Sequence, residues 1–100
     1  MNSEKTLAVC CCVMLFVAEP AFTGGTIGRT VGVTCNACHG PDGKSKGAIP
    51  SLDGLTAKQI ESKLLAFRSG KQSATIMNRI ARGYTDNEIA AVAEYFANLK

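Results

Sequence analysis

The sequence predicts an all-α fold in which short helices and long loops form one small domain. Two segments carry apolar residues at the three- and four-residue spacing of a helix face, and no segment shows the alternation of a strand. Residues 40–55, which precede both of these segments, are rich in Gly, Pro, Ser and Asp, and this composition is typical of a loop. A chain this small has only a marginal core, and its long loops need a further stabilising feature to become ordered.

Residues 7–18 form an uncharged apolar run that follows Lys5 and ends at Glu19 and Pro20. The run is shorter than the roughly 20 residues that cross a bilayer, and it fits the core of a secretory signal peptide. We therefore predict an exported, periplasmic protein with no stable membrane insertion after the signal is removed.

The end of this signal peptide is predicted between residues 18 and 25, where several small residues occur close together. We assign residues 1–21 to the signal and residues 22–100 to the mature domain. An uncleaved interfacial anchor and a lipoprotein processed before Cys10 are the alternatives.

The predicted mature chain is mildly basic. The full sequence has 11 Lys and Arg against 8 Asp and Glu; Lys5, Glu4 and Glu19 lie in the signal, which leaves 10 against 6, a charge of +4. The basic residues are spread along the chain without a cluster, so nucleic-acid binding has no support. A net positive charge favours docking onto an acidic patch of a partner protein.

The first helix of the mature chain is predicted over residues 26–37, leading into a pair of cysteines. Gly28 and Gly32 lie four residues apart on one helix face, so another helix can approach closely there.

A second helix is predicted from Ala57 to about Arg68, with Thr56 as its N-cap and Gly70 at its stop position. Its apolar face consists of Ile60, Leu64 and Phe67.

Residues 71–83 follow as a linker with one helical turn over residues 76–81. Thr85 and Glu88 then form the capping box of the last helix. The buried stripe predicted for this helix comprises Ile89, Val92, Ala93, Phe96 and Leu99.

The chemistry of the chain centres on Cys35, Cys38 and His39, which make up a C-x-x-C-H motif. This motif is the signature of covalent haem c attachment. Two thiols at this spacing reach the two vinyl groups of one porphyrin and form thioethers, and the next residue directs its imidazole to the iron. Because Cys10, Cys11 and Cys12 lie in the predicted signal, the mature chain has no competing thiols.

Two other sites use similar residues. A Cys-x-x-Cys redox dithiol is expected next to a βαβ unit, and no strand is predicted here. A structural zinc site needs four ligands, whereas the mature chain supplies two cysteines and one histidine.

The second axial ligand is predicted to be Met77, the only methionine outside the signal. His39 is the only histidine, so ligation by two histidines of this chain is excluded. A His/Met pair gives a six-coordinate iron with a raised potential. The alternative is that Met77 fills a gap in the core.

Pro50 lies in the loop after the motif and is either a turn former or the residue whose carbonyl accepts a hydrogen bond from His39 Nδ1. Tyr84, Arg79 and Arg82 are candidates to reach the haem propionates or are surface residues.

Taken together, these residues resemble the class I c-type cytochromes over nearly the whole mature length. The matching runs are residues 35–40 (CNACHG), 48–52 (AIPSL), 67–70 (FRSG), Met77, 85–89 (TDNEI) and 95–96 (YF). Residues 74–85 (ATIMNRIARGYT) are more narrowly similar to the cytochrome subunit of flavocytochrome c sulfide dehydrogenase. Some cytochrome subunits of that family carry two haems on a longer chain, and the single motif here matches only the monohaem form.

The resemblance implies short helices packed around one covalent haem, held by Cys35, Cys38, His39 and Met77, with Pro50 as the carbonyl partner of the histidine. It also implies an electron-transfer protein that is no enzyme by itself. Its partner would be an FAD-containing flavoprotein that oxidises sulfide, and other redox proteins would accept the electrons. The alternatives are a free periplasmic electron carrier, a haem sensor or peroxidase with an open distal site, and a thiol redox protein.

Overall fold

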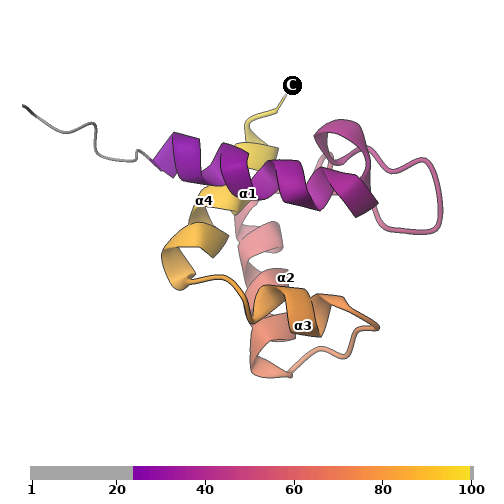
Figure 1. Cartoon of the computed structure of the whole chain (residues 1–100), viewed down its shortest axis with the longest axis vertical. Coiled ribbons are helices and arrows are strands. Elements are labelled where there is room, and N and C mark those ends of the chain that lie inside the picture. Colours follow the sequence, from indigo (N-terminus) through magenta and orange to yellow (C-terminus); the bar gives the residue numbers. More distant parts are fainter. Residues whose placement is uncertain (1–23, 100) are drawn as a thin grey trace, which may run out of the picture.

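The computed structural model describes residues 24–99 (Figure 1). Within this range the chain consists of helices and loops without a strand, so the predicted helical fold is confirmed. The predicted signal peptide, residues 1–21, lies outside the described residues. No helix in the described part of the chain is long and apolar enough to cross a membrane.

The helices follow one another as α1 (Gly24–His39), the short 3-10 helix η1 (Pro41–Gly43), α2 (Ala57–Ser69), α3 (Met77–Ala81) and α4 (Asp86–Ala97). Helix α1 starts two residues earlier than predicted, and it runs through the cysteine motif where the prediction ended it at residue 37. The sequence predicts a loop over η1, because Pro, Asp and Gly favour turns, whereas the structure forms a short 3-10 helix there.

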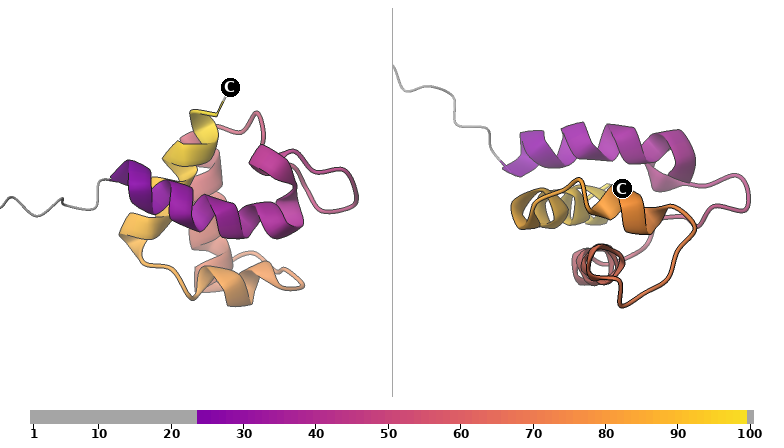
Figure 2. Two further views of the ribbon diagram at one scale, coloured as in Figure 1. Left: turned by 45° about the horizontal axis from the view of Figure 1, so that its top comes forward. Right: turned by 60° about the horizontal axis from the view of Figure 1, so that its bottom comes forward.

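Helix α1 lies across α4, and α2 packs on the opposite side of α4 (Figure 2). The crossing of α1 and α4 depends on two buried glycines of α1. A Cβ atom on Gly28 would lie 2.3 Å from the carbonyl oxygen of Ala91, and one on Gly32 would lie 2.4 Å from Cε1 of Tyr95. The close approach predicted at these glycines is therefore confirmed.

Both long helices after the loop begin with a capping box. In α4 the Thr85 hydroxyl accepts from the Glu88 N–H, and the Glu88 carboxylate accepts from the Thr85 N–H, as predicted. In α2 the predicted N-cap Thr56 is joined by Gln59 in the same reciprocal arrangement. Each box satisfies two backbone donors that a helix start otherwise leaves without partners.

The core lies where α1, α2 and α4 meet. Its buried cluster comprises Val31, Ile60, Val92, Ala93 and Phe96. The predicted stripe of α4 is buried through Phe96, but α4 ends at Ala97, so Leu99 lies beyond the helix and is only half-buried. Leu64 and Phe67 of α2 are likewise half-buried rather than fully enclosed.

Helix α3 packs on α2 and is not among the elements that pack against α1. Figure 2 shows α3 beyond one end of α4, on the side where the loop of residues 44–55 leaves α1. Apolar side chains on this side remain exposed: Ile49 is 43% exposed, Ile76 57% and Ile80 37%. One side of the fold is therefore packed on itself, and the other presents apolar groups that none of the described elements fully covers.

Candidate haem-binding site

Three residues of the predicted attachment motif lie in the last turn of α1. Cys35 and Cys38 are three positions apart on a continuous helix, which makes their side chains neighbours on one face. Both are free thiols; Cys38 is exposed, whereas Cys35 is half-buried and packs against the core cluster. The helix thus brings the two sulfurs to one side of α1 directly before His39.

The two thiols differ in their surroundings. Burial raises the pKa of the Cys35 thiol. Burial favours the neutral form of a thiol, so Cys35 stays protonated and packs as a small apolar group at neutral pH.

The orientation of His39 is set by a hydrogen bond to the Pro50 carbonyl oxygen, 2.6 Å from Nδ1. A carbonyl only accepts, so Nδ1 carries the proton in this contact. In the neutral ring Nε2 then has a free lone pair, which is the form of imidazole that binds a metal. The hydrogen bond predicted between Pro50 and His39 is present in the structure.

A turn directly after the motif begins the path of the chain toward Pro50. Gly40 adopts a positive φ of 88°, and a Cβ atom there would lie 2.1 Å from the Lys44 carbonyl oxygen. Only glycine fits such a position without displacing backbone. The Asn36 side chain then accepts a hydrogen bond from the Gly43 N–H at 3.1 Å and holds the turn against α1.

The rest of the loop is closed by hydrogen bonds across it. The Gly43 carbonyl accepts from the N–H of Leu52 at 2.8 Å, and the Ser51 hydroxyl accepts from the N–H of Ser45 at 2.9 Å. These contacts bring the two ends of the loop together and place the Pro50 carbonyl beside His39. The sequence does not indicate these roles, because Asn36 resembles an ordinary polar helix residue and Ser51 an ordinary polar loop residue.

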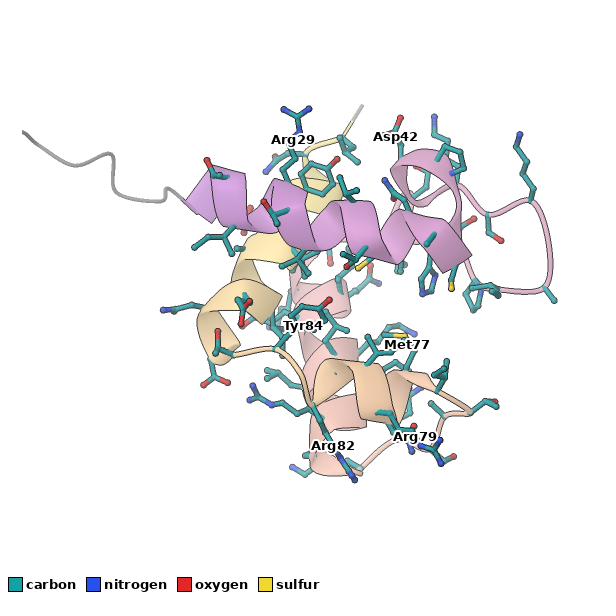
Figure 3. All side chains as sticks on the ribbon, in the orientation of Figure 1. Arg29, Asp42, Met77, Arg79, Arg82 and Tyr84 are labelled. Carbon is teal, nitrogen blue, oxygen red and sulfur yellow. The ribbon has the colours of Figure 1, made fainter. Side chains whose placement is uncertain are left out.

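Met77 is the first residue of α3 and is half-buried. Figure 3 shows it on the side of α3 that faces α1. Because α3 packs on α2 and not on α1, the thioether and the attachment motif belong to facing elements that are not in close contact. The structure thus places Met77 opposite the motif, although 38 positions of sequence separate it from His39.

These residues fit a covalently bound haem. They supply two thiols on one helix face, an imidazole whose Nε2 is free, and a thioether on a facing element. Ile49 on the loop and Ile80 on α3 are exposed apolar side chains, and apolar groups suit the apolar faces of a porphyrin.

The candidate propionate contacts are arranged differently. The Tyr84 hydroxyl lies 3.1 Å from the Thr34 hydroxyl of α1. Arg79 and Arg82 are exposed, and Figure 3 shows both directed away from α1. The arginines are surface residues in this arrangement, and Thr34 is a neighbour of the motif that the sequence analysis did not identify.

The comparison with family models decides the class of protein. The model for cytochrome c matches residues 26–100. The chain belongs to the cytochrome c family. Members of this family carry covalent haem c and transfer electrons, so the predicted family, cofactor and kind of function are confirmed.

Two of the curated relatives of this cytochrome are described as components of sulfide or thiosulfate dehydrogenase systems. It is 44% identical over 72 residues to the cytochrome subunit of sulfide dehydrogenase from Chlorobaculum tepidum, an alignment that covers 72% of this chain and 66% of that protein. It is 45% identical over 69 residues to the thiosulfate dehydrogenase electron acceptor of Stutzerimonas stutzeri, covering 65% of this chain and 32% of that protein.

A smaller relative is cytochrome c-554(548) of Halomonas halodenitrificans, which is 39% identical over 69 residues. The alignment covers 65% of this chain and 83% of that cytochrome. The chain therefore spans most of the Halomonas cytochrome, about two thirds of the Chlorobaculum subunit and about one third of the Stutzerimonas protein.

Proposed function

We propose that this cytochrome transfers single electrons outside the cytoplasm through one haem c held by Cys35, Cys38, His39 and Met77. The observation that carries the proposal is the hydrogen bond from His39 Nδ1 to the Pro50 carbonyl, because it orients the ring and leaves Nε2 free for iron. When bound, haem c supplies an iron that takes up and releases one electron.

The last turn of α1 provides the attachment. Cys35 and Cys38 would hold the haem through two thioether bonds to its vinyl groups. The covalent bonds then keep the cofactor with the protein outside the cell's interior, and they fix it next to the imidazole of His39.

Met77 supplies the second axial ligand in this proposal. Its place on the side of α3 that faces α1 supports the role. With His39 and Met77 both holding the iron, the haem would supply electron transfer and would leave no free site for small molecules. A thioether opposite an imidazole also raises the reduction potential.

The proposed partner is an FAD-containing flavoprotein that oxidises sulfide, with other redox proteins as acceptors. Support comes from the 44% identity to a protein described as the cytochrome subunit of sulfide dehydrogenase. The signal peptide predicted over residues 1–21 supports export to the periplasm, where this partnership would operate.

A free-standing periplasmic carrier is the second candidate. It is favoured by the Halomonas cytochrome, of which this chain covers 83%. Copurification from the native host separates the two: a subunit elutes in gel filtration with a flavin-containing protein, whereas a carrier elutes alone near the size of the monomer.

The haem assignment is tested by a haem stain on a denaturing gel, together with the intact mass of the exported protein. We expect covalent haem on a chain whose mass also gives the cleavage site. A colourless mature chain without added haem mass would refute the proposal.

The axial ligand is tested with Met77→Leu, and Ile76→Leu serves as the matched control because Ile76 is the exposed neighbour that caps α3. We expect Met77→Leu to lose the absorption band of a thioether bound to ferric iron and to bind CO readily in the ferrous state. The control should keep the band. Ready CO binding by the unmodified protein would instead favour a sensor or peroxidase with an open distal site.

A further inference from the structure

We propose that Tyr84 is a positioning residue that keeps Met77 on the haem iron, through the hydrogen bond between its hydroxyl and Thr34. The inference rests on the proposed haem ligation. It concerns two residues that are not ligands: Thr34 precedes Cys35 in α1, and Tyr84 lies between α3 and α4.

The direction of this hydrogen bond follows from the neighbouring contacts. The Thr34 hydroxyl lies 2.6 Å from the Val31 carbonyl oxygen, and the hydroxyl must donate there because a carbonyl only accepts. Its single proton is then in use, so in the 3.1 Å contact the Tyr84 hydroxyl donates and Thr34 accepts. A continuous chain of donors therefore runs from Tyr84 through Thr34 to the backbone of α1.

The other end of Tyr84 is held by α2. Arg68 Nη1 donates to the Tyr84 carbonyl oxygen at 3.2 Å, and the same guanidinium pairs with Asp86 at the start of α4. The Tyr84 N–H donates in turn to the Ala81 carbonyl at the end of α3. The backbone of Tyr84 is therefore fixed to α2 and α3, while its side chain reaches α1.

This link matters because α1 and α3 share no extensive packing. The attachment motif is part of the long helix α1. Met77 instead begins α3, a helix of only five residues, and Tyr84 follows seven positions after Met77. Figure 3 shows Tyr84 between α1 and α3, on the same side of the molecule as Met77. The Tyr84–Thr34 hydrogen bond thus opposes movement of α3 away from the motif, which is the movement that would pull Met77 from the iron.

The test is the rate at which imidazole binds to the ferric holoprotein, because imidazole has to replace Met77. Tyr84→Phe keeps the ring that packs against the core and removes only the hydroxyl. Since an intramolecular hydrogen bond contributes modestly to stability, we expect imidazole to bind about threefold to tenfold faster. The thioether absorption band should remain at low imidazole, and the covalent haem should be retained.

Four further variants separate positioning from general loosening. Thr34→Val should give an increase similar to Tyr84→Phe, and the double variant should add nothing, because both changes remove the same bond. Thr34→Ser keeps the hydroxyl and should bind imidazole at the original rate. Tyr95→Phe, a matched change in a tyrosine packed on Gly32, should leave the rate unchanged.

An unchanged rate in Tyr84→Phe, or additive effects in the double variant, would overturn the inference. Failure of the underlying haem ligation is seen separately, in an unmodified protein that lacks the thioether band. If Tyr84→Phe does not fold, Thr34→Val decides alone, because it leaves the tyrosine in place.

Discussion

The two sides of this cytochrome are built on different principles. Where α1, α2 and α4 meet, the protein supplies its own core: Val92 and Ala93 are 2% and 0% exposed, and two glycines let α1 touch α4. On the side formed by residues 44–55 and α3, apolar residues such as Ile76 are exposed, and the loop is held by hydrogen bonds across it and by Leu52 and Leu55, which pack against the core at its end. We call these the packed side and the cofactor side.

The difference shows which part of the sequence serves stability and which serves the cofactor. The packed side needs complementary shapes, so its critical residues are glycines and apolar side chains at helix spacing. With the function proposed above, the cofactor side needs donors directed at one place, and a backbone carbonyl, two thiols, an imidazole and a thioether would supply them. A protein of this size gains much of its stability from what the second side holds.

The largest effect is expected from the double change Cys35→Ala and Cys38→Ala, which removes both attachment points. Without covalent haem, amide hydrogens of α3 and of residues 44–51 should exchange at least tenfold faster, because these segments carry exposed apolar side chains such as Ile49 and Ile80 that the bound haem would cover. The packed side should keep more protection, at the marginal level that a small core allows. Hydrogen exchange followed by mass spectrometry measures both sides at once. Equal loss on both sides would show that they form a single cooperative unit.

On the packed side, Gly28→Ala should destabilise the holoprotein by about 1–3 kcal/mol despite the better helix propensity of alanine. The new methyl group would meet the Ala91 carbonyl at 2.3 Å, and backbone cannot give way as a side chain can. Guanidinium unfolding measures the change. Gly47→Ala is the control, because nothing lies within 4 Å of its new Cβ. Equal stabilities of the two variants would contradict the described crossing of α1 and α4.

A smaller effect is expected at the start of α4. Thr85→Ala removes the acceptor for the Glu88 N–H and should cost about 1 kcal/mol, whereas Thr85→Ser should cost little. Thermal unfolding of the holoprotein measures both. Since Thr85 follows Tyr84 directly, imidazole binding to Thr85→Ala shows whether the cap serves the packed side alone. We expect that rate to be unchanged.

The smallest effect is expected from Asp86→Asn. Asp86 pairs with Arg68, but its side chain is 81% exposed, so the pair should contribute about 0.5 kcal/mol or less. The loss should shrink further as salt is added, because exposed charges are screened. Denaturant unfolding at low and high salt measures it. A loss of several kcal/mol would mean that the ion pair, rather than the Tyr84 backbone contact, holds α2 to α4.

The packed side was largely predictable from the sequence because its signals are local. Apolar spacing identifies α2 and α4, capping residues mark their starts, and the pair Gly28 and Gly32 indicates a close helix contact. Leu99 marks the limit of such reasoning. Its spacing continues the stripe of α4, but the helix ends two residues earlier, at Ala97.

On the cofactor side the sequence predicts the proposed haem ligands, but it says less about the residues that support them. The motif at Cys35, Cys38 and His39 is contiguous, and Met77 is identified by elimination. The turn η1 and the roles of Asn36 and Thr34 depend on residues brought together by the fold. Thr34 and Tyr84 are 50 positions apart, and no local pattern relates them.

The sequence by itself determined the class of fold, the mode of haem attachment and the identity of the residues able to ligate iron. These depend on residue types at short spacing, where geometry is nearly fixed by the helix. Only the tertiary structure decided that Pro50 contacts His39 at 2.6 Å, that Met77 lies on the side of α3 facing the motif, and that Tyr84 bonds to Thr34. Those contacts join residues distant in sequence, and they exist because the packing of α1, α2 and α4 sets where the remaining chain must pass.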